Sequence, residues 1–165
     1  MVIYTNLKNE NYIISKNLVF YMCGIFMLLN NPSNMNKSSS LVYNSFMKGK
    51  GRGPEHSVLT EFLMSVPIGF HRLAINGLND GANPPLIVNG VQLICNGEIY
   101  NYKELYESLQ ITPSTDSDCE VIIHLYLKFG IEKTLQMLDG VFAFALQDGN
   151  NLDFPIYLAR DPYGV

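Results

Sequence analysis

The stretch Leu86-Ile87-Val88-Asn89-Gly90-Val91-Gln92-Leu93-Ile94-Cys95 decides the fold. Two runs rich in aliphatic and β-branched residues, 86–88 and 91–95, flank the pair Asn89-Gly90. Asn-Gly is the preferred pair for a two-residue type I′ turn, because both positions of that turn need a positive φ. The stretch therefore predicts an antiparallel β-hairpin.

A second Asn-Gly pair, Asn96-Gly97, follows at once and leads to a helical pattern over 102–109. Asn101 is expected to cap that helix, with Glu104 three positions on. Because the first pair already closes the hairpin, the second needs its own reason, and one reason is simply another turn. The alternative is chemical, since an asparagine NH2 beside an unhindered glycine N–H gives two adjacent donors, the composition of an oxyanion hole.

The C-terminal half continues with helices and then strands. Ser117 and Glu120 have the spacing of a capping box, and Gly130 is expected to end the helix that they begin. Two strands, 141–146 and 154–159, come last. Strands, helices and strands joined by hairpins indicate an α+β fold with mostly antiparallel sheets. The apolar face of the capped helix is expected at Val121, Ile122, Leu125 and Phe129.

Leu18–Leu29 is an unbroken apolar run near the N-terminus. It is too short to cross a bilayer as a helix, which takes about 20 residues. Its β-branched and aromatic residues favour a buried strand. The alternative is a secreted or membrane-tethered binding protein, but no small-x-small cleavage site follows the run.

Composition limits the possible functions of the 165 residues. Hydrophobic residues make up 47% and charged residues 16%, so we expect a globular chain of one domain or one domain plus a tail. Eleven basic against fifteen acidic residues give a net charge of −4, which argues against a nucleic-acid groove. The histidines are scattered, so no bound metal is expected. The cysteines, which are odd in number and without a Cys-x-x-Cys pair, favour a reducing compartment, and we expect the cytoplasm; they are Cys23, Cys95 and Cys119.

Cys23 directly follows a methionine, Met22. If translation began at Met22 and this methionine were removed, the α-amine of Cys23 would lie within reach of its own thiol. Their ordinary pKa values, about 8 and about 8.5, are nearly matched. Such a pair is a nucleophile with a built-in base. The alternative is an ordinary core cysteine in a strand.

Arg72 and Asp118 are the charged residues with a possible binding role. Arg72 lies in the apolar context 69–75, where its guanidinium is either paired internally or suited to a substrate carboxylate. Asp118 stands in the first turn of a predicted helix, where a carboxylate also simply complements the helix dipole.

Together these motifs resemble the glutaminase domain (class II glutamine amidotransferase) of glutamine-hydrolysing asparagine synthetase, in the same order and over residues 22–165. The motifs are Met22-Cys23-Gly24-Ile25-Phe26, Arg52-Gly53-Pro54-Glu55, His71-Arg72-Leu73-Ala74-Ile75, Asn96-Gly97-Glu98-Ile99-Tyr100-Asn101, Ser117-Asp118-Cys119-Glu120, Leu138-Asp139-Gly140-Val141-Phe142-Ala143-Phe144-Ala145 and Arg160-Asp161-Pro162-Tyr163-Gly164.

The resemblance implies an N-terminal-nucleophile hydrolase fold, a four-layer αββα sandwich of antiparallel sheets, apparently truncated at its C-terminal end. Residues 1–22 are expected to be an N-terminal extension, and 23–165 an incomplete glutamine amidotransferase type-2 domain. The family's Ser-Gly-Gly-Leu-Asp-Ser loop does not occur in the sequence, so the synthetase domain is expected to be absent. No cofactor is expected in this chain, because ATP and Mg would belong to that absent domain.

The resemblance also implies catalytic roles. Cys23 would attack the side-chain carboxamide of glutamine, with its α-amine as the proton shuttle. The Asn96 side chain and the Gly97 N–H would hold the oxyanion.

Substrate binding follows from the same resemblance. Arg72 would bind the α-carboxylate, Leu73 and Ile75 would add backbone contacts, and Glu98 and Asp118 would receive the α-ammonium; Asn96 is expected to contact the glutamine as well.

The function implied is hydrolysis of glutamine to glutamate and ammonia, with a synthetase domain or subunit using the ammonia to amidate aspartate. Neither nucleic acid nor a membrane is expected as a partner. One alternative is an inert or regulatory fragment with the glutaminase fold, and another is the glutaminase part of a different class II amidotransferase. Residues 1–22 would block the α-amine of Cys23, so we expect synthesis to start at Met22 or the extension to be removed.

Overall fold

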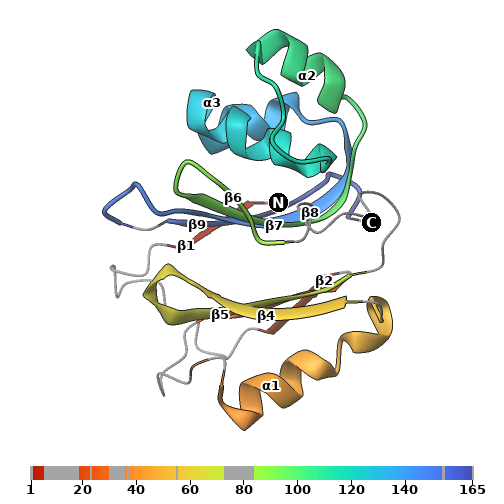
Figure 1. Cartoon of the computed structure of the whole chain (residues 1–165), viewed down its shortest axis with the longest axis vertical. Coiled ribbons are helices and arrows are strands. Elements are labelled where there is room, and N and C mark those ends of the chain that lie inside the picture. The colour runs from red at the N-terminus through yellow and green to blue at the C-terminus, as the bar shows by residue number, and fades with distance from the viewer. Residues whose placement is uncertain are drawn as a thin grey trace.

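The computed structural model describes residues 2–5, 19–22, 24–29, 36, 38–54, 56–72, 84–153 and 155–164. They form two antiparallel sheets stacked face to face, with helices outside each sheet (Figure 1). The five-stranded sheet has the order β1-β9-β8-β7-β6, with β1 Val2–Thr5, β6 Leu86–Val88, β7 Val91–Ile99, β8 Gly140–Asp148 and β9 Ile156–Arg160. The four-stranded sheet has the order β2-β3-β5-β4, with β2 Val19–Met22, β3 Ile25–Leu28, β4 His56–Phe62 and β5 Val66–Arg72.

The helices make the two outer layers. Figure 1 shows α2 (Tyr102–Leu109) and α3 (Val121–Met137) over the five-stranded sheet and α1 (Ser40–Met47) over the other sheet. This is a four-layer αββα arrangement, so the expected α+β class and layer order are confirmed. Short 3₁₀ turns connect the elements: η1 Lys50–Arg52, η2 Leu63–Ser65 and η4 Asp118–Glu120.

Strand alternation divides the buried side chains of β7 between two core layers. Leu93 packs in the cluster under α2 and α3, whereas its neighbour Ile94 packs in the cluster between the sheets. Because successive side chains of a strand point to opposite faces, the inter-sheet face of β7 runs through Ile94, Asn96 and Glu98. Among the described residues the inter-sheet cluster also contains Met27, Ile68, Ala145 and Ile156.

The predicted hairpin is confirmed. Val88 pairs with Val91, and Asn89 and Gly90 have φ values of 47° and 77°, as a type I′ turn requires. The second Asn-Gly pair is not a turn, so that interpretation is wrong. β7 continues through Asn96 and Gly97, which pair with Ala143 and Phe142 of β8.

Two expected helix caps are wrong. The Asn101 side chain does not cap α2: its Nδ2 donates to Met137 O at 2.9 Å and its Oδ1 accepts from Asp139 N at 3.1 Å. The segment before β8 therefore occupies the Asn101 amide that would otherwise cap the helix. No capping box forms at Ser117 either, because the Glu120 carboxylate is occupied by the loop before it.

Gly130 ends the first part of the helix as predicted, since its φ of +76° breaks α3 internally, and a second helical part follows to Met137. Val121, Ile122 and Leu125 are fully buried, but Phe129 is 43% exposed, so its place on the buried face was wrongly predicted.

The apolar run 18–29 is not a single strand, contrary to the prediction. β2 and β3 pair antiparallel, with Met22 opposite Ile25, and only residues 23 and 24 connect them. The sequence pattern also missed β4, which pairs with β5 along its whole length. In the described ranges, no helix is both long and apolar enough to cross a membrane.

Candidate functional site

The backbone N–H of Gly97 forms no hydrogen bond with the neighbouring strand β8. Phe142, which lies opposite Gly97, accepts from Asp161 N at 2.8 Å and donates to Asp161 Oδ2 at 3.3 Å. In an antiparallel pair the N–H and C=O of a residue serve the same neighbour, so both groups of Phe142 are used on the side of β9. The Gly97 N–H is therefore left without an acceptor on β8.

The other edge of β7 is open beyond its first residues. β6 pairs only with Val91, Gln92 and Leu93, so no described strand covers β7 from Ile94 onward. Asp118 of η4 lies there, because its Oδ2 accepts from Ile99 N at 2.6 Å. Cys119 Sγ lies 3.9 Å from Gly97 O on the same side. The Asp118 carboxylate is thus held next to the Gly97 backbone.

Asn96 presents its amide beside this backbone. It shares the inter-sheet face of β7 with Ile94 and is half-buried. Within the described part of the chain no residue bonds its side chain. Glu98, the next residue on that face, is exposed. The end of β7 therefore offers two neighbouring donors, the Asn96 NH2 and the Gly97 N–H, and a carboxylate on either side of them, Glu98 and Asp118.

Gly97 meets a steric requirement at this point. Its φ is +145°, and a Cβ there would lie 2.1 Å from Val141 O and 2.5 Å from Phe142 Cα. Only glycine fits. This close approach is the reason for the second Asn-Gly pair that the hairpin did not need.

The segment after Cys23 is fixed to β5. Gly24 O accepts from His71 N at 2.8 Å, and a Cβ on Gly24 would lie 2.4 Å from His71 O. His71 directly precedes Arg72, so the sheet brings Gly24 next to the end of β5. β3 and β7 are also in contact across the inter-sheet core.

Several predicted site residues lie outside the described residues: Cys23, Leu73 and Ile75. For Arg72 the structure describes the backbone, which pairs with His56 at the end of β5. Asn96, Gly97, Glu98 and Asp118 lie together at the end of β7, and their roles in binding and catalysis stay predictions.

The sequence pattern did not single out His71 as important for the site. His71 is 2% exposed, its Nε2 donates to Phe46 O at 2.8 Å, and its Nδ1 shares a hydrogen bond with Ser57 Oγ at 2.8 Å. The ring stacks on Phe46 with centroids 4.0 Å apart. The available signal was a histidine in an apolar strand directly before Arg72.

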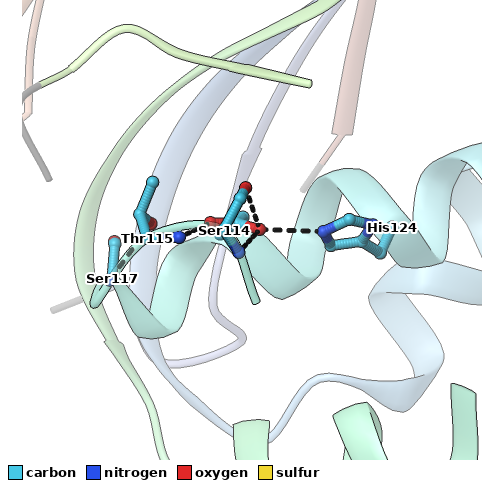
Figure 2. A network of polar contacts seen from close by, with 5 residues as sticks. Ser114, Thr115, Ser117 and His124 are labelled. Atoms are coloured by element: carbon cyan, nitrogen blue, oxygen red, sulfur yellow. Dashed lines mark hydrogen bonds and ion pairs between the residues drawn. The ribbon is translucent and has the colours of Figure 1, made fainter. Parts of the chain in front are cut away.

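Glu120 is the second group that the sequence pattern did not assign to the site. Its buried carboxylate accepts from the backbone N–H of Ser114 and Thr115, from Ser114 Oγ and from His124 Nε2, all within 2.9 Å (Figure 2). Burial alone would raise the pKa of Glu120, but these hydrogen bonds outweigh it and lower the pKa to about 2. Glu120 is therefore an anion at neutral pH.

Of the two described cysteines, Cys119 is buried and Cys95 is a poor nucleophile. A hydrogen bond with Cys119 and burial raise the pKa of Cys95 well above its ordinary value. A protonated, enclosed thiol is chemically quiet. No group of three or more His, Cys, Asp or Glu side chains among the described residues could hold a metal ion.

The four layers are those that the resemblance implies for a glutamine-hydrolysing domain. A family model for the "Glutamine amidotransferase domain" matches residues 22–165, and the chain belongs to this family.

The chain is 41% identical over 148 residues to the glutamine-hydrolysing asparagine synthetase of Gallus gallus and 39% identical to that of Homo sapiens, in each case covering 87% of this chain and 25% of the relative. It thus spans about a quarter of the length of the curated relatives it matches. Among solved structures, the glutamine phosphoribosylpyrophosphate amidotransferase of B. subtilis, complexed with ADP and GMP, is 30% identical with a TM-score of 0.49, over 61% of this chain and 24% of that chain.

Proposed function

We propose that this chain hydrolyses glutamine to glutamate and ammonia through a thioester on Cys23. The observation that carries the proposal is the Gly97 N–H, which β8 does not bond and which lies beside the Asn96 amide at an open strand edge. Membership of the glutamine amidotransferase family supports it.

The reaction proceeds in two steps. The Cys23 sulfur attacks the side-chain carbonyl carbon of glutamine, its proton passes to its own α-amine, and the carbonyl oxygen becomes an oxyanion. Asn96 and Gly97 donate to that oxyanion. The carbon–nitrogen bond then breaks, the α-amine returns the proton to the leaving group, and ammonia departs. Water hydrolyses the thioester to glutamate and the free thiol.

The substrate's α-groups define its orientation. The Arg72 guanidinium binds the α-carboxylate as a fork, with backbone contacts from Leu73 and Ile75. Glu98 and Asp118 receive the α-ammonium. The carboxylate of Asp118 suits this role because Ile99 N already fixes it next to Gly97.

The ammonia, in our proposal, serves the ATP-dependent amidation of aspartate by a synthetase domain or subunit. The support is that the relatives carry the name asparagine synthetase and are about four times as long as the matched region. ATP and Mg would act in that partner, and we propose no cofactor for this chain. The free thiols of Cys95 and Cys119 fit a reducing compartment, and we place the reaction in the cytoplasm.

The proposed chemistry requires a free α-amine on Cys23. The strand order is compatible with loss of residues 1–22, because β1 and β2 are each the outermost strand of their sheet. Removing them makes β9 and β3 the new outermost strands and leaves every other strand pair intact. We propose that the active form begins at Cys23.

Ammonia release from glutamine, compared between the full chain and Cys23→Ala, tests the function. The N-terminal residue of each preparation is established by intact mass. We expect release from the chain that begins at Cys23 and none from Cys23→Ala. Equal release from both would end the proposal of a thioester on Cys23. Release from a protein whose residue 22 is still joined to Cys23 would overturn the role of the free α-amine.

A second candidate is an inert or regulatory module with the same fold. One observation favours it: β2 continues the sheet directly before residue 23, so the extension is accommodated as a strand. A purified protein that keeps residues 1–22 and releases no ammonia would support this candidate.

A further inference from the structure

We propose that Glu120, which has no contact role in the reaction above, is a positioning residue that sets the preference for substrates carrying an α-ammonium group. It does so by holding the loop that presents Asp118. The proposal rests on the proposed function, in which Asp118 receives that ammonium.

The loop before Asp118 is built around the Glu120 carboxylate. Glu120 Oε1 accepts from Ser114 N and Ser114 Oγ, each at 2.8 Å, and Oε2 accepts from Thr115 N at 2.7 Å. Oε1 also accepts from His124 Nε2 at 2.9 Å, one turn along α3. The side chain of Glu120 is 0% exposed, so none of these donors can be replaced by bulk water without opening the structure.

The hydrogen bonds continue from this carboxylate to Asp118. Thr115 Oγ1 accepts from Ser117 N at 3.2 Å, and Ser117 O accepts from Glu120 N at 3.2 Å. Ser117 is thus held from both sides, and Asp118 follows it directly. Asp118 Oδ2 then bonds Ile99 N at 2.6 Å, next to the donor pair of β7.

Charge and geometry make a carboxylate necessary at position 120. Four donors converge on its two oxygens, and Figure 2 shows the serine, threonine and histidine donors arranged around it. A glutamine side chain has one acceptor oxygen and one NH2. If its oxygen keeps the Ser114 and His124 bonds, its NH2 faces the Thr115 N–H, and two donors repel. Glu120→Gln should therefore release the loop at Thr115 and loosen Asp118.

The test compares glutamine with glutaramic acid, which is glutamine without its α-amino group. Values of kcat/KM for ammonia release are measured for the parent protein and for Glu120→Gln, each shown by intact mass to begin at Cys23. We expect the preference for glutamine over glutaramic acid to fall roughly tenfold in Glu120→Gln, because a hydrogen bond to a charged group accounts for about that factor. Most of the fall should come from a higher KM for glutamine.

The matched control is Thr134→Val on the same helix. Thr134 is also 0% exposed, and its hydroxyl donates to Gly130 O at 2.8 Å, away from the loop 114–118. This variant loses a buried hydrogen bond of α3 but leaves the Asp118 loop intact. A purely structural role of Glu120 would lower kcat/KM for both substrates equally in both variants, leaving the preference unchanged.

Amide hydrogen exchange at Ile99 separates this proposal from the proposed function, because it needs no activity. The Ile99 N–H is held by Asp118 Oδ2, so Glu120→Gln should speed its exchange and Thr134→Val should not. Unchanged Ile99 exchange in Glu120→Gln, or an unchanged substrate preference, overturns the positioning role. Absence of ammonia release from the parent chain with a free Cys23 overturns the proposed function instead, and with it the substrate preference, whatever the Ile99 exchange shows.

Discussion

At residue 97 the absence of a side chain allows β7 and β8 to approach each other closely. Gly97 lies so close to β8 that any Cβ would overlap Val141 O, and its φ of +145° is open to few other residues. The same position exposes the N–H that we assign to the oxyanion. Both the packing against β8 and the proposed oxyanion contact therefore require glycine at position 97.

Gly97→Ala should lower the free energy of unfolding by at least about 3 kcal/mol, since the new methyl group meets backbone atoms that cannot move away. Ammonia release should fall below detection with it. Chemical denaturation measures the stability change. The control is Gly51→Ala, where a Cβ would meet nothing within 4 Å, and its stability should stay within about 1 kcal/mol of the parent. A Gly97→Ala protein as stable as Gly51→Ala would show that β7 and β8 do not approach as described.

The pair Asn96-Gly97 shows what a residue pattern leaves undecided about the local backbone. The donor composition of Asn96-Gly97 predicted an oxyanion site, and in the described structure β8 leaves the Gly97 N–H without an acceptor. The same pair was also compatible with a turn, because Asn-Gly prefers turns whenever no tertiary contact opposes them. The need for glycine arises from Val141 and Phe142, more than forty residues further along, and no local pattern contains that information.

At the scale of elements, helix α1 packs on its sheet through the stacked rings of Phe46 and His71, and the Phe46 ring lies over Gly69. The Phe46 ring lies over Gly69 of β5, where a Cβ would come within 2.5 Å of the ring. The His71 ring stacks on the Phe46 ring and forms hydrogen bonds with Phe46 O and with Ser57 Oγ of β4. The imidazole of His71 thus connects α1, β4 and β5. The backbone N–H of His71 also donates to Gly24 O.

His71→Ala should destabilise the protein by about 2–4 kcal/mol, because it leaves a cavity under α1 and removes the partner of the buried Phe46 O and of the half-buried Ser57 hydroxyl. Ser57→Ala removes one of the two bonds and should cost about 1 kcal/mol. In the double variant the costs should not add, since Ser57 and His71 share one hydrogen bond. Urea unfolding of the four proteins gives the cycle, and full additivity would mean that the Ser57–His71 bond contributes nothing.

Element prediction succeeded where the signal was local and failed where a distant partner decided. The type I′ turn at Asn89-Gly90 and the break at Gly130 both depend on backbone preferences of their own residues. The cap expected from Asn101 failed because Met137 and Asp139, brought in by tertiary folding, compete for its amide. β2 and β3 were predicted as one strand, because the apolar run 18–29 contains no polar turn residue at the point where the chain reverses.

At the scale of the whole molecule, the N-terminal segment contributes to both sheets without lying inside either. β1 pairs only with β9, and β2 pairs only with β3. The fold and the availability of the Cys23 amine are therefore separable properties of this chain.

A chain that begins at Cys23 should keep the αββα fold and lose only the hydrogen bonds of two edge strands. We expect the free energy of unfolding to fall by roughly 1–3 kcal/mol, since each net hydrogen bond contributes about 1 kcal/mol and ordering the segment costs entropy. Urea unfolding should stay cooperative, and amide exchange in β7 and β8 should remain slow. Ammonia release per molecule should exceed that of a chain shown by mass to retain residues 1–22. A shortened chain that no longer unfolds cooperatively would mean that β1 and β2 are needed to assemble the two sheets, and the active form would then have to free its α-amine while keeping those strands bound.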